Sequence, residues 1–157
     1  MDIPHSSEAN WFSGSLEPCS FDDVLDKIKT VDPTQLYVGC DSHLRQQVYY
    51  FAVAVCFKTD VGWVYFWKRY KYPQKVFPNL KLRLQHEVLL SLSLANEIRD
   101  TSKDKDIWVH ADLNENPKYK SSQSTKQLTN LIKAMGFNCE IKPCSWAASS
   151  VADWHAK

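Results

Sequence analysis

The sequence lacks the features that mark several common classes of protein. No apolar run approaches the roughly 18–20 residues that a membrane span needs, and the N-terminus lacks the basic and apolar parts of a signal peptide. It contains neither a glycine-rich phosphate loop nor a recognisable nucleophilic triad. We therefore expect a protein without a membrane segment that stays in the compartment where it is made.

Paired cysteines are also absent. The five cysteines are an odd number and none of them forms a CxxC pair. Cys40 and Cys56 lie in apolar runs, where a reduced thiol packs as a small hydrophobic group. Cys139 and Cys144 have a poor spacing for zinc ligation. We expect reduced, structural cysteines, as in intracellular proteins.

What is present indicates one globular α/β domain. The chain has 157 residues, of which 44% are hydrophobic and 13% aromatic, enough for a substantial core. Residues 1–19 show no periodicity and are expected to form an irregular arm. A single domain, 20–157, follows, and Ser20 with Asp23 predicts the start of its first helix. Further helices are expected at 79–99, 121–135 and 146–155, and strands at 36–41, 48–58, 63–72, 106–112 and 138–141.

After the first helix, this order reads β-β-β-α-β-α-β-α. It predicts a mixed five-stranded sheet flanked by helices, with an extra N-terminal helix. The first three strands are expected to form an antiparallel meander, whereas the later crossovers require parallel pairing. The predicted first and fourth strands end in Asp41 and Asp112. If these strands are parallel neighbours, both carboxylates lie where open α/β sheets bind ligands.

Four carboxylates lie at the edges of apolar segments: Asp41, Glu87, Asp112 and Asp153. Burying an unpaired charge is costly, and divalent cations are suitable partners for such a group. Each residue also has a structural alternative. Asp41 and Asp112 could start turns, Glu87 could pair with Arg83 on the helix surface, and Asp153 could be solvated near a frayed terminus.

Basic residues have a local distribution that the net charge of +1 conceals. One group is interleaved with aromatic residues in the third predicted strand, and another follows Asp112. Both patterns are typical of a phosphate-binding surface, and equally of the solvated edge of a twisted sheet. The candidate nucleic-acid-binding residues are Lys68, Arg69, Lys71, Lys118, Lys120 and Lys126.

Three sequence blocks resemble the ribonuclease H-like superfamily, and most closely its uncharacterised YkuK-type family of bacteria and phages. They are YVGCDSH at 37–43, HADLN at 110–114 with PKYK at 117–120, and IKPCSWAASSVAD at 141–153. The resemblance implies the ribonuclease H-like fold and a metal-dependent endonuclease. It also implies location in the bacterial cytoplasm, or in the host cytoplasm for a phage-encoded protein.

The resemblance further implies that Asp41, Glu87, Asp112 and Asp153 are metal ligands and catalytic residues. They would hold two Mg²⁺ or Mn²⁺ ions about 4 Å apart, with Asp41 bridging the two. His155 is a further catalytic candidate that could orient water or assist product release. His43, His110 and His155 each lie two residues from an aspartate, and each could equally be exposed and without a role.

The expected substrate is nucleic acid, and first of all the RNA strand of an RNA–DNA hybrid. A Holliday junction or other branched DNA is the alternative, because resolvases share this fold. An alternative of another class is a non-catalytic module that binds nucleic acid or protein. The chain is expected to act as a monomer or a homodimer, without membrane attachment.

Overall fold

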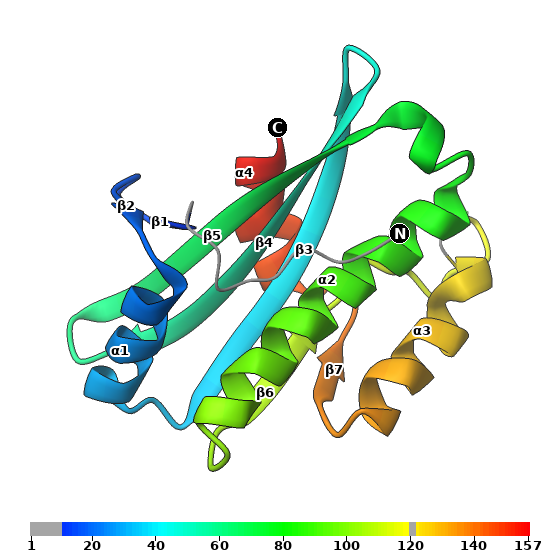
Figure 1. Ribbon diagram of the computed structural model, residues 1–157. Coiled ribbons are helices and arrows are strands. Elements are labelled where there is room, and N and C mark those ends of the chain that lie inside the picture. Colours follow the sequence, from blue (N-terminus) through cyan, green and yellow to red (C-terminus); the bar gives the residue numbers. More distant parts are fainter. Residues whose placement is uncertain (1–10, 120–121) are drawn as a thin grey trace.

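A computed structural model of the protein describes residues 11–119 and 122–157. It shows a mixed α/β fold with one seven-stranded sheet (Figure 1). The strands are β1 (Trp11–Ser13), β2 (Pro18–Cys19), β3 (Gln35–Arg45), β4 (Val48–Thr59), β5 (Gly62–Pro73), β6 (Asp106–His110) and β7 (Asn138–Glu140). The helices are α1 (Phe21–Val31), α2 (Leu80–Thr101), α3 (Ser122–Ala134) and α4 (Asp153–Ala156), with a 3₁₀ turn at Gln74–Val76 and a π-helical segment, η2, at Ala147–Ala152.

The five strands that the sequence predicts, β3 to β7, pair in the sheet as expected. The strand order of the sheet is β2-β1-β5-β4-β3-β6-β7. Strands β3, β4 and β5 form the antiparallel meander, and β6 pairs in parallel with both β3 and β7. None of the described helices is long and apolar enough to cross a membrane.

Two corrections concern the N-terminal segment. The sheet has seven strands rather than five, because residues 11–19, expected to be irregular, form β1 and β2 at its edge. Trp11 is completely buried, pairs with Lys68 of β5 and contacts the ring of Phe21. Strands of three and two residues are too short to show periodicity in a sequence. Residues 1–10 of the expected arm lie outside the described part of the chain.

The first helix begins as predicted. The Ser20 hydroxyl accepts from the Asp23 backbone N–H, and the Asp23 carboxylate accepts from the Ser20 N–H. Such a cap stabilises the helix by about 1 kcal/mol. The helix buries Phe21, Val24 and Ile28 against the sheet. It ends at Asp32, which adopts a left-handed conformation before Pro33.

The two faces of the sheet carry different elements. Helices α1, α2 and α3 pack on one face, and η2 with α4 on the other (Figure 1). Along β3, Val38 and Cys40 point into the core under α2, whereas Tyr37 packs under η2. Gly39 also faces η2, and a Cβ there would lie 2.4 Å from the backbone nitrogen of Ala148. Because residue 39 is a glycine, the backbone of η2 can pack directly against β3.

Strand β3 is longer than predicted, and this changes the position of Asp41. The strand continues to Arg45, because residues 41–45 pair with β4 down to a tight turn at Gln46 and Gln47. Both turn residues have positive φ, as a two-residue hairpin turn requires. On its other edge β3 loses its partner where β6 ends at His110. Asp41 therefore lies within a strand, beside the open end of β6.

Candidate metal centre

Asp41, His43 and Asp153 meet on the face of the sheet that carries η2 and α4. Residues two apart in a strand share a face, so Asp41 and His43 project together, and α4 begins above them at Asp153. His43 Nε2 lies 2.6 Å from Asp153 Oδ1 and 3.5 Å from Asp41 Oδ2. One donor atom from each of the three residues lies within 4.8 Å of the others. This is a compact set of possible metal ligands.

Glu87 approaches the same strand from the other face. It is 4% exposed, in the middle of α2, and its Oε2 accepts a hydrogen bond of 2.5 Å from the Ser42 hydroxyl. Arg83 Nε lies 4.0 Å from the same oxygen. Because Ser42 follows Asp41 directly, it points to the α2 face while Asp41 points to the α4 face. The expected Arg83–Glu87 pair exists, but Glu87 is buried rather than on an exposed surface.

Asp112 lies two residues beyond β6, on the segment next to Asp41. Gly39 is in register with His110, so the two aspartates occupy corresponding positions along neighbouring chain segments. Lys142 Nζ is 3.0 Å from Asp112 Oδ1. The two groups form an ion pair but not a hydrogen bond, and the buried Oδ1 has no hydrogen-bond donor in the described structure. Asp112 and Glu87 also line one small hollow in the core.

The carboxylates influence one another electrostatically. Burial, then the charge of Glu87, a hydrogen bond with Asp153 and the charge of Asp112, raises the pKa of Asp41 to about 9. Burial likewise raises the pKa of Glu87 to about 8, although Ser42 and Arg83 oppose the shift. Burial also opposes ionisation of Asp153, but hydrogen bonds with Asp41, His43 and Lys157 outweigh it and lower the pKa of Asp153 to about 2. Electrostatic interactions therefore link the four predicted carboxylates, which we call the carboxylate cluster. Of the four, only Asp41 and Asp153 belong, with His43, to the group whose donor atoms lie within 4.8 Å of one another in the described structure.

His155 and His110 have other surroundings. His155 Nε2 is 2.9 Å from the Tyr65 hydroxyl, and its ring stacks on Trp67 at 4.1 Å. Residues two apart on a helix point in nearly opposite directions, so His155 turns away when Asp153 faces the cluster. His110 is buried and its Nδ1 accepts from the Ala147 N–H, which ties β6 to η2. A catalytic role for His155 stays a prediction, and His43 is the described histidine that contacts the carboxylates.

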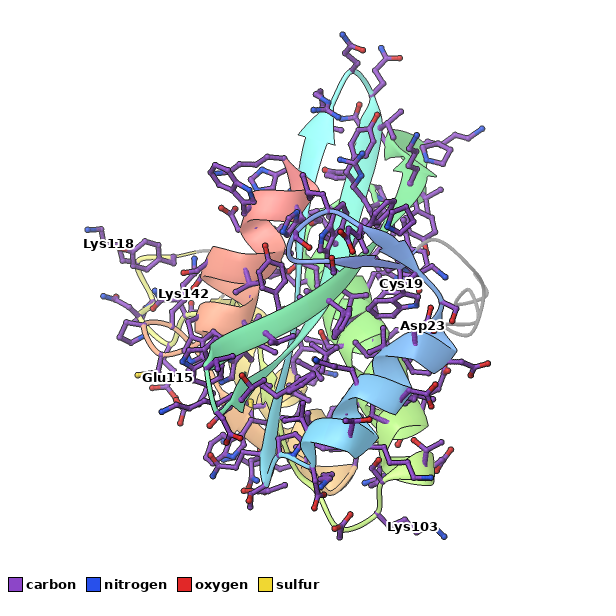
Figure 2. All side chains as sticks on the ribbon, turned by 90° about the vertical axis from the view of Figure 1, so that its left-hand side faces the viewer. Cys19, Asp23, Lys103, Glu115, Lys118 and Lys142 are labelled. Carbon is purple, nitrogen blue, oxygen red and sulfur yellow. The ribbon has the colours of Figure 1, made fainter. Side chains whose placement is uncertain are left out.

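The candidate nucleic-acid-binding residues fall into separate groups. Arg69 and Lys71 are exposed on β5, and Lys118 and Lys126 are exposed after β6 and on α3. Figure 2 shows Lys118 on the same side of the molecule as Lys142, away from Cys19. Lys120 lies outside the described residues. Lys68 is 4% exposed, with β1 paired alongside it, and Arg69 lies on the opposite face of β5. Contact of Lys68 with nucleic acid stays a prediction.

Three polar residues join the cluster that the sequence did not assign to it. Ser42 hydrogen bonds Glu87, Lys142 pairs with Asp112, and Lys157 Nζ lies 3.0 Å from Asp153 Oδ2. Strand alternation could have placed Ser42 opposite Asp41. The positions of Lys142 and Lys157 depend on how the last segment folds back over the sheet.

The donor set suits a hard divalent cation. Four carboxylates supply oxygen ligands, which Mg²⁺ and Mn²⁺ prefer. The buried Asp112 Oδ1 lacks a hydrogen-bond donor, and the pKa of Asp41 is raised to about 9. Both observations indicate that the protein alone does not favour full ionisation of these groups, which a bound cation would favour. The residues present therefore fit a metal centre.

The comparisons with known proteins give one match. The family described as ribonuclease H-like matches residues 21–157. Searches of curated proteins and of solved structures give no match. The matched segment covers most of the chain, from α1 to the last residue, and includes all four carboxylates. On this match, and with a mixed α/β fold that is consistent with it, the chain belongs to the ribonuclease H-like family.

Proposed function

We propose that the protein is a metal-dependent nuclease that hydrolyses phosphodiester bonds at the carboxylate cluster. The observation that carries this proposal is the convergence of Asp41, Glu87, Asp112 and Asp153 from three elements and a loop, with the pKa of Asp41 raised to about 9. A structural role gives no reason to gather four carboxyl groups in a mostly buried position, because ionising them together without a cation destabilises the fold.

The four carboxylates would hold two Mg²⁺ or Mn²⁺ ions, with Asp41 as the central ligand. Bound divalent cations neutralise charge on a phosphate and lower the pKa of a water molecule. The remaining residues act on the ligands. Ser42 orients Glu87, His43 orients Asp153, and Lys142 compensates Asp112 in the metal-free protein.

We propose the RNA strand of an RNA–DNA hybrid as the first substrate to test. Family membership supports a nucleic-acid substrate, and the exposed basic residues Arg69 and Lys71 on the cluster's side of the sheet are compatible with one. Four-way DNA junctions are the alternative substrate. A junction-cleaving enzyme needs two active sites on a two-fold symmetric substrate, so the oligomeric state separates these two readings.

The test combines substrates, metals and one matched pair of variants. Labelled hybrid, duplex, single-stranded and four-way-junction substrates are incubated with Mg²⁺, Mn²⁺ or EDTA, and the products are separated on a denaturing gel. We expect cleavage with either cation, none in EDTA, and loss of at least about 100-fold in rate for Asp41→Asn. The control Asp26→Asn changes an exposed aspartate of α1 and should retain full activity.

The outcomes that overturn the proposal are distinct. Cleavage by Asp41→Asn at the wild-type rate excludes the metal mechanism. Tight binding of nucleic acid without cleavage in any metal, unchanged in Asp41→Asn, indicates the non-catalytic binding module instead. Gel filtration with light scattering, run on the same samples, determines whether the active species is a monomer or a dimer.

A further inference from the structure

Three exposed cations surround one aromatic ring beside the carboxylate cluster. The guanidinium carbons of Arg45 and Arg69 lie 4.6 Å and 5.1 Å from the centre of the Tyr50 ring, and Lys71 Nζ lies 5.8 Å from it. Tyr50 is half-buried on β4, between the strands that carry the cations. We call Arg45, Tyr50, Arg69 and Lys71 the Tyr50 cluster.

The sheet register places this cluster on the same face as Asp41. His43, Tyr50 and Lys71 form one cross-strand row, and Asp41, Ala52 and Arg69 form the next. Directly paired residues project to the same face. Neighbouring strands are about 4.8 Å apart, so the Arg69 backbone lies about 10 Å from that of Asp41. The Tyr50 cluster therefore borders the carboxylates across two strands.

The charges of the cluster are not balanced within the described structure. No ion pair there involves Arg45, Arg69 or Lys71. Other cations of the chain do have acidic partners, such as Lys105 with Asp32 and Lys157 with Asp153. Three like charges around one ring repel each other, and cation–π contacts at an exposed site return only about 0.5–1 kcal/mol. A polyanion bound over the cluster would relieve this repulsion.

We infer that the Tyr50 cluster binds backbone phosphates of the nucleic-acid strand, next to the phosphate held at the carboxylates. This inference rests on the proposed function. Guanidinium groups suit phosphate because they donate in a planar fork. Contacts with phosphates position a strand without reading its sequence. The cations lie over the Tyr50 ring, so the ring orients them rather than stacking on a base.

The shape of the sheet agrees with this placement. The β3–β4 hairpin extends beyond the end of β6, and α4 lies beside it (Figure 1). Arg45 lies at the tip of the hairpin and Arg69 beside the carboxylates, so the cluster leads from the tip toward Asp41. A bound strand would follow β4 and β5 to the carboxylates. Lys118 and Lys126 belong to a different part of the surface and are not needed for this contact.

The test measures how binding of an oligonucleotide depends on salt. A fluorescein-labelled, mixed-sequence single-stranded RNA is titrated with protein in EDTA, which stops hydrolysis, at several NaCl concentrations. A plot of log K against log salt concentration has a negative slope, and each lost phosphate contact makes that slope shallower by about 0.7. We expect the slope to become shallower by about 0.7 in each of Arg45→Gln, Arg69→Gln and Lys71→Gln, and by about 2 in the triple variant. Arg69→Lys keeps the charge and should keep the slope.

Lys103→Gln is the matched control. Lys103 is exposed, has no ion pair in the described structure, and lies at the opposite end of the molecule from the β3–β4 hairpin tip (Figure 2). Its slope should equal that of the wild type. Circular dichroism of each variant checks that a change in slope comes from the lost contact and not from unfolding.

Failure of this inference can be distinguished from failure of the proposed function. Wild-type slopes in all three single variants and in the triple variant overturn the inference, even if the protein cleaves. Saturable binding of polyglutamate in place of RNA, lost in the triple variant, also overturns it and indicates an acidic protein partner. Slope changes as expected in a protein that never cleaves support the inference and reject only the nuclease.

Discussion

The Ser42 hydroxyl donates a hydrogen bond of 2.5 Å to the Glu87 carboxylate, joining β3 to α2 directly behind Asp41. Asp41 and Ser42 are neighbours in the chain but serve opposite faces of the sheet. One strand thus presents one of the proposed ligands, Asp41, and positions another, Glu87, on a helix. On the α2 side, Glu87 and Asp112 line one small hollow beside the end of β6.

Removing this contact should weaken metal binding. In Ser42→Ala, Glu87 loses the hydrogen bond that favours its charged form, and the side chain is no longer held in place. Partners of metal ligands typically contribute 10–100-fold in affinity, so we expect Mn²⁺ to bind at least about tenfold more weakly. Isothermal titration calorimetry measures the affinity. Ser42→Thr keeps the hydroxyl and should restore most of it, and equal affinity for Ser42→Ala would exclude this role.

The stability of the metal-free protein should fall as the pH rises from about 7 to 9. The pKa of Asp41 is raised to about 9 and that of Glu87 to about 8, mainly by burial. Unfolding returns the two groups to ordinary values of 3.8 and 4.5. The folded state therefore holds protons that the unfolded state has released, and rising pH favours unfolding by about 1 kcal/mol per pH unit for each carboxyl group that is still protonated. Above about pH 9 this trend ends.

Thermal unfolding in EDTA, followed across this range, tests the expectation. Below about pH 6.5 the buried His86 and His110, whose pKa values burial lowers to about 4, produce the opposite trend, so the measurement starts at neutral pH. Asp41→Asn removes one of the two carboxyl groups and should flatten the curve. Saturating Mg²⁺ should stabilise the wild type increasingly as the pH rises. A wild-type melting temperature independent of pH contradicts the shifted pKa values.

Lys142 should compete with the metal rather than assist it. Its ammonium lies 3.0 Å from Asp112 Oδ1, where it compensates the carboxylate when no cation is bound. A positive charge several ångströms from a divalent ion costs about 1 kcal/mol in a solvated site. We therefore expect Lys142→Met to bind Mn²⁺ about fivefold more tightly and to be less stable in EDTA. Lys142→Arg keeps the charge and serves as the control. Weaker binding by Lys142→Met would instead assign Lys142 to positioning Asp112.

Gly39→Ala should move Asp153 away from the other carboxylates. A Cβ at this position would lie 2.4 Å from the backbone nitrogen of Ala148 and 2.5 Å from the carbonyl carbon of Ala147. Because backbone atoms of η2 cannot rotate away, the segment that carries Asp153 must shift. We expect a loss of about 1–3 kcal/mol in stability and much slower cleavage. Chemical denaturation and the gel assay measure the two effects. A fully stable, fully active variant would show that η2 does not fix the position of Asp153.

The sequence was most informative where local signals and long strands coincide. The capping box at Ser20 and Asp23, the meander of β3, β4 and β5, and the parallel placement of β6 were all predictable. The juxtaposition of Asp41 and Asp112 follows from that placement. Strands β1 and β2 were not predictable, because they exist only through pairing with β5 and the burial of Trp11. Their residues carry no pattern of their own.

Tertiary contacts explain the remaining differences at the site. His155 was the catalytic candidate because of the family resemblance, and in the structure its ring contacts Tyr65 and Trp67. In the sequence, Lys68 belongs to a basic run. Because side chains alternate between the two faces of β5, however, it points away from Arg69 and Lys71 and into the protein. Ser42 and Lys142 gain their partners from residues 45 and 30 positions away. No local pattern encodes such pairings.

The alternation at Asp41 and Ser42 also limits how the length of this chain can vary. Adding or deleting a single residue between Gly39 and Ser42 would reverse the face on which every later side chain of β3 lies. Asp41 would then point toward α2, and Ser42 toward α4. The turn at Gln46 and Gln47 lies at the free tip of the hairpin, where lengthening the loop leaves the register of β3 and β4 intact. Insertions are therefore tolerable at that tip and not within the strand itself.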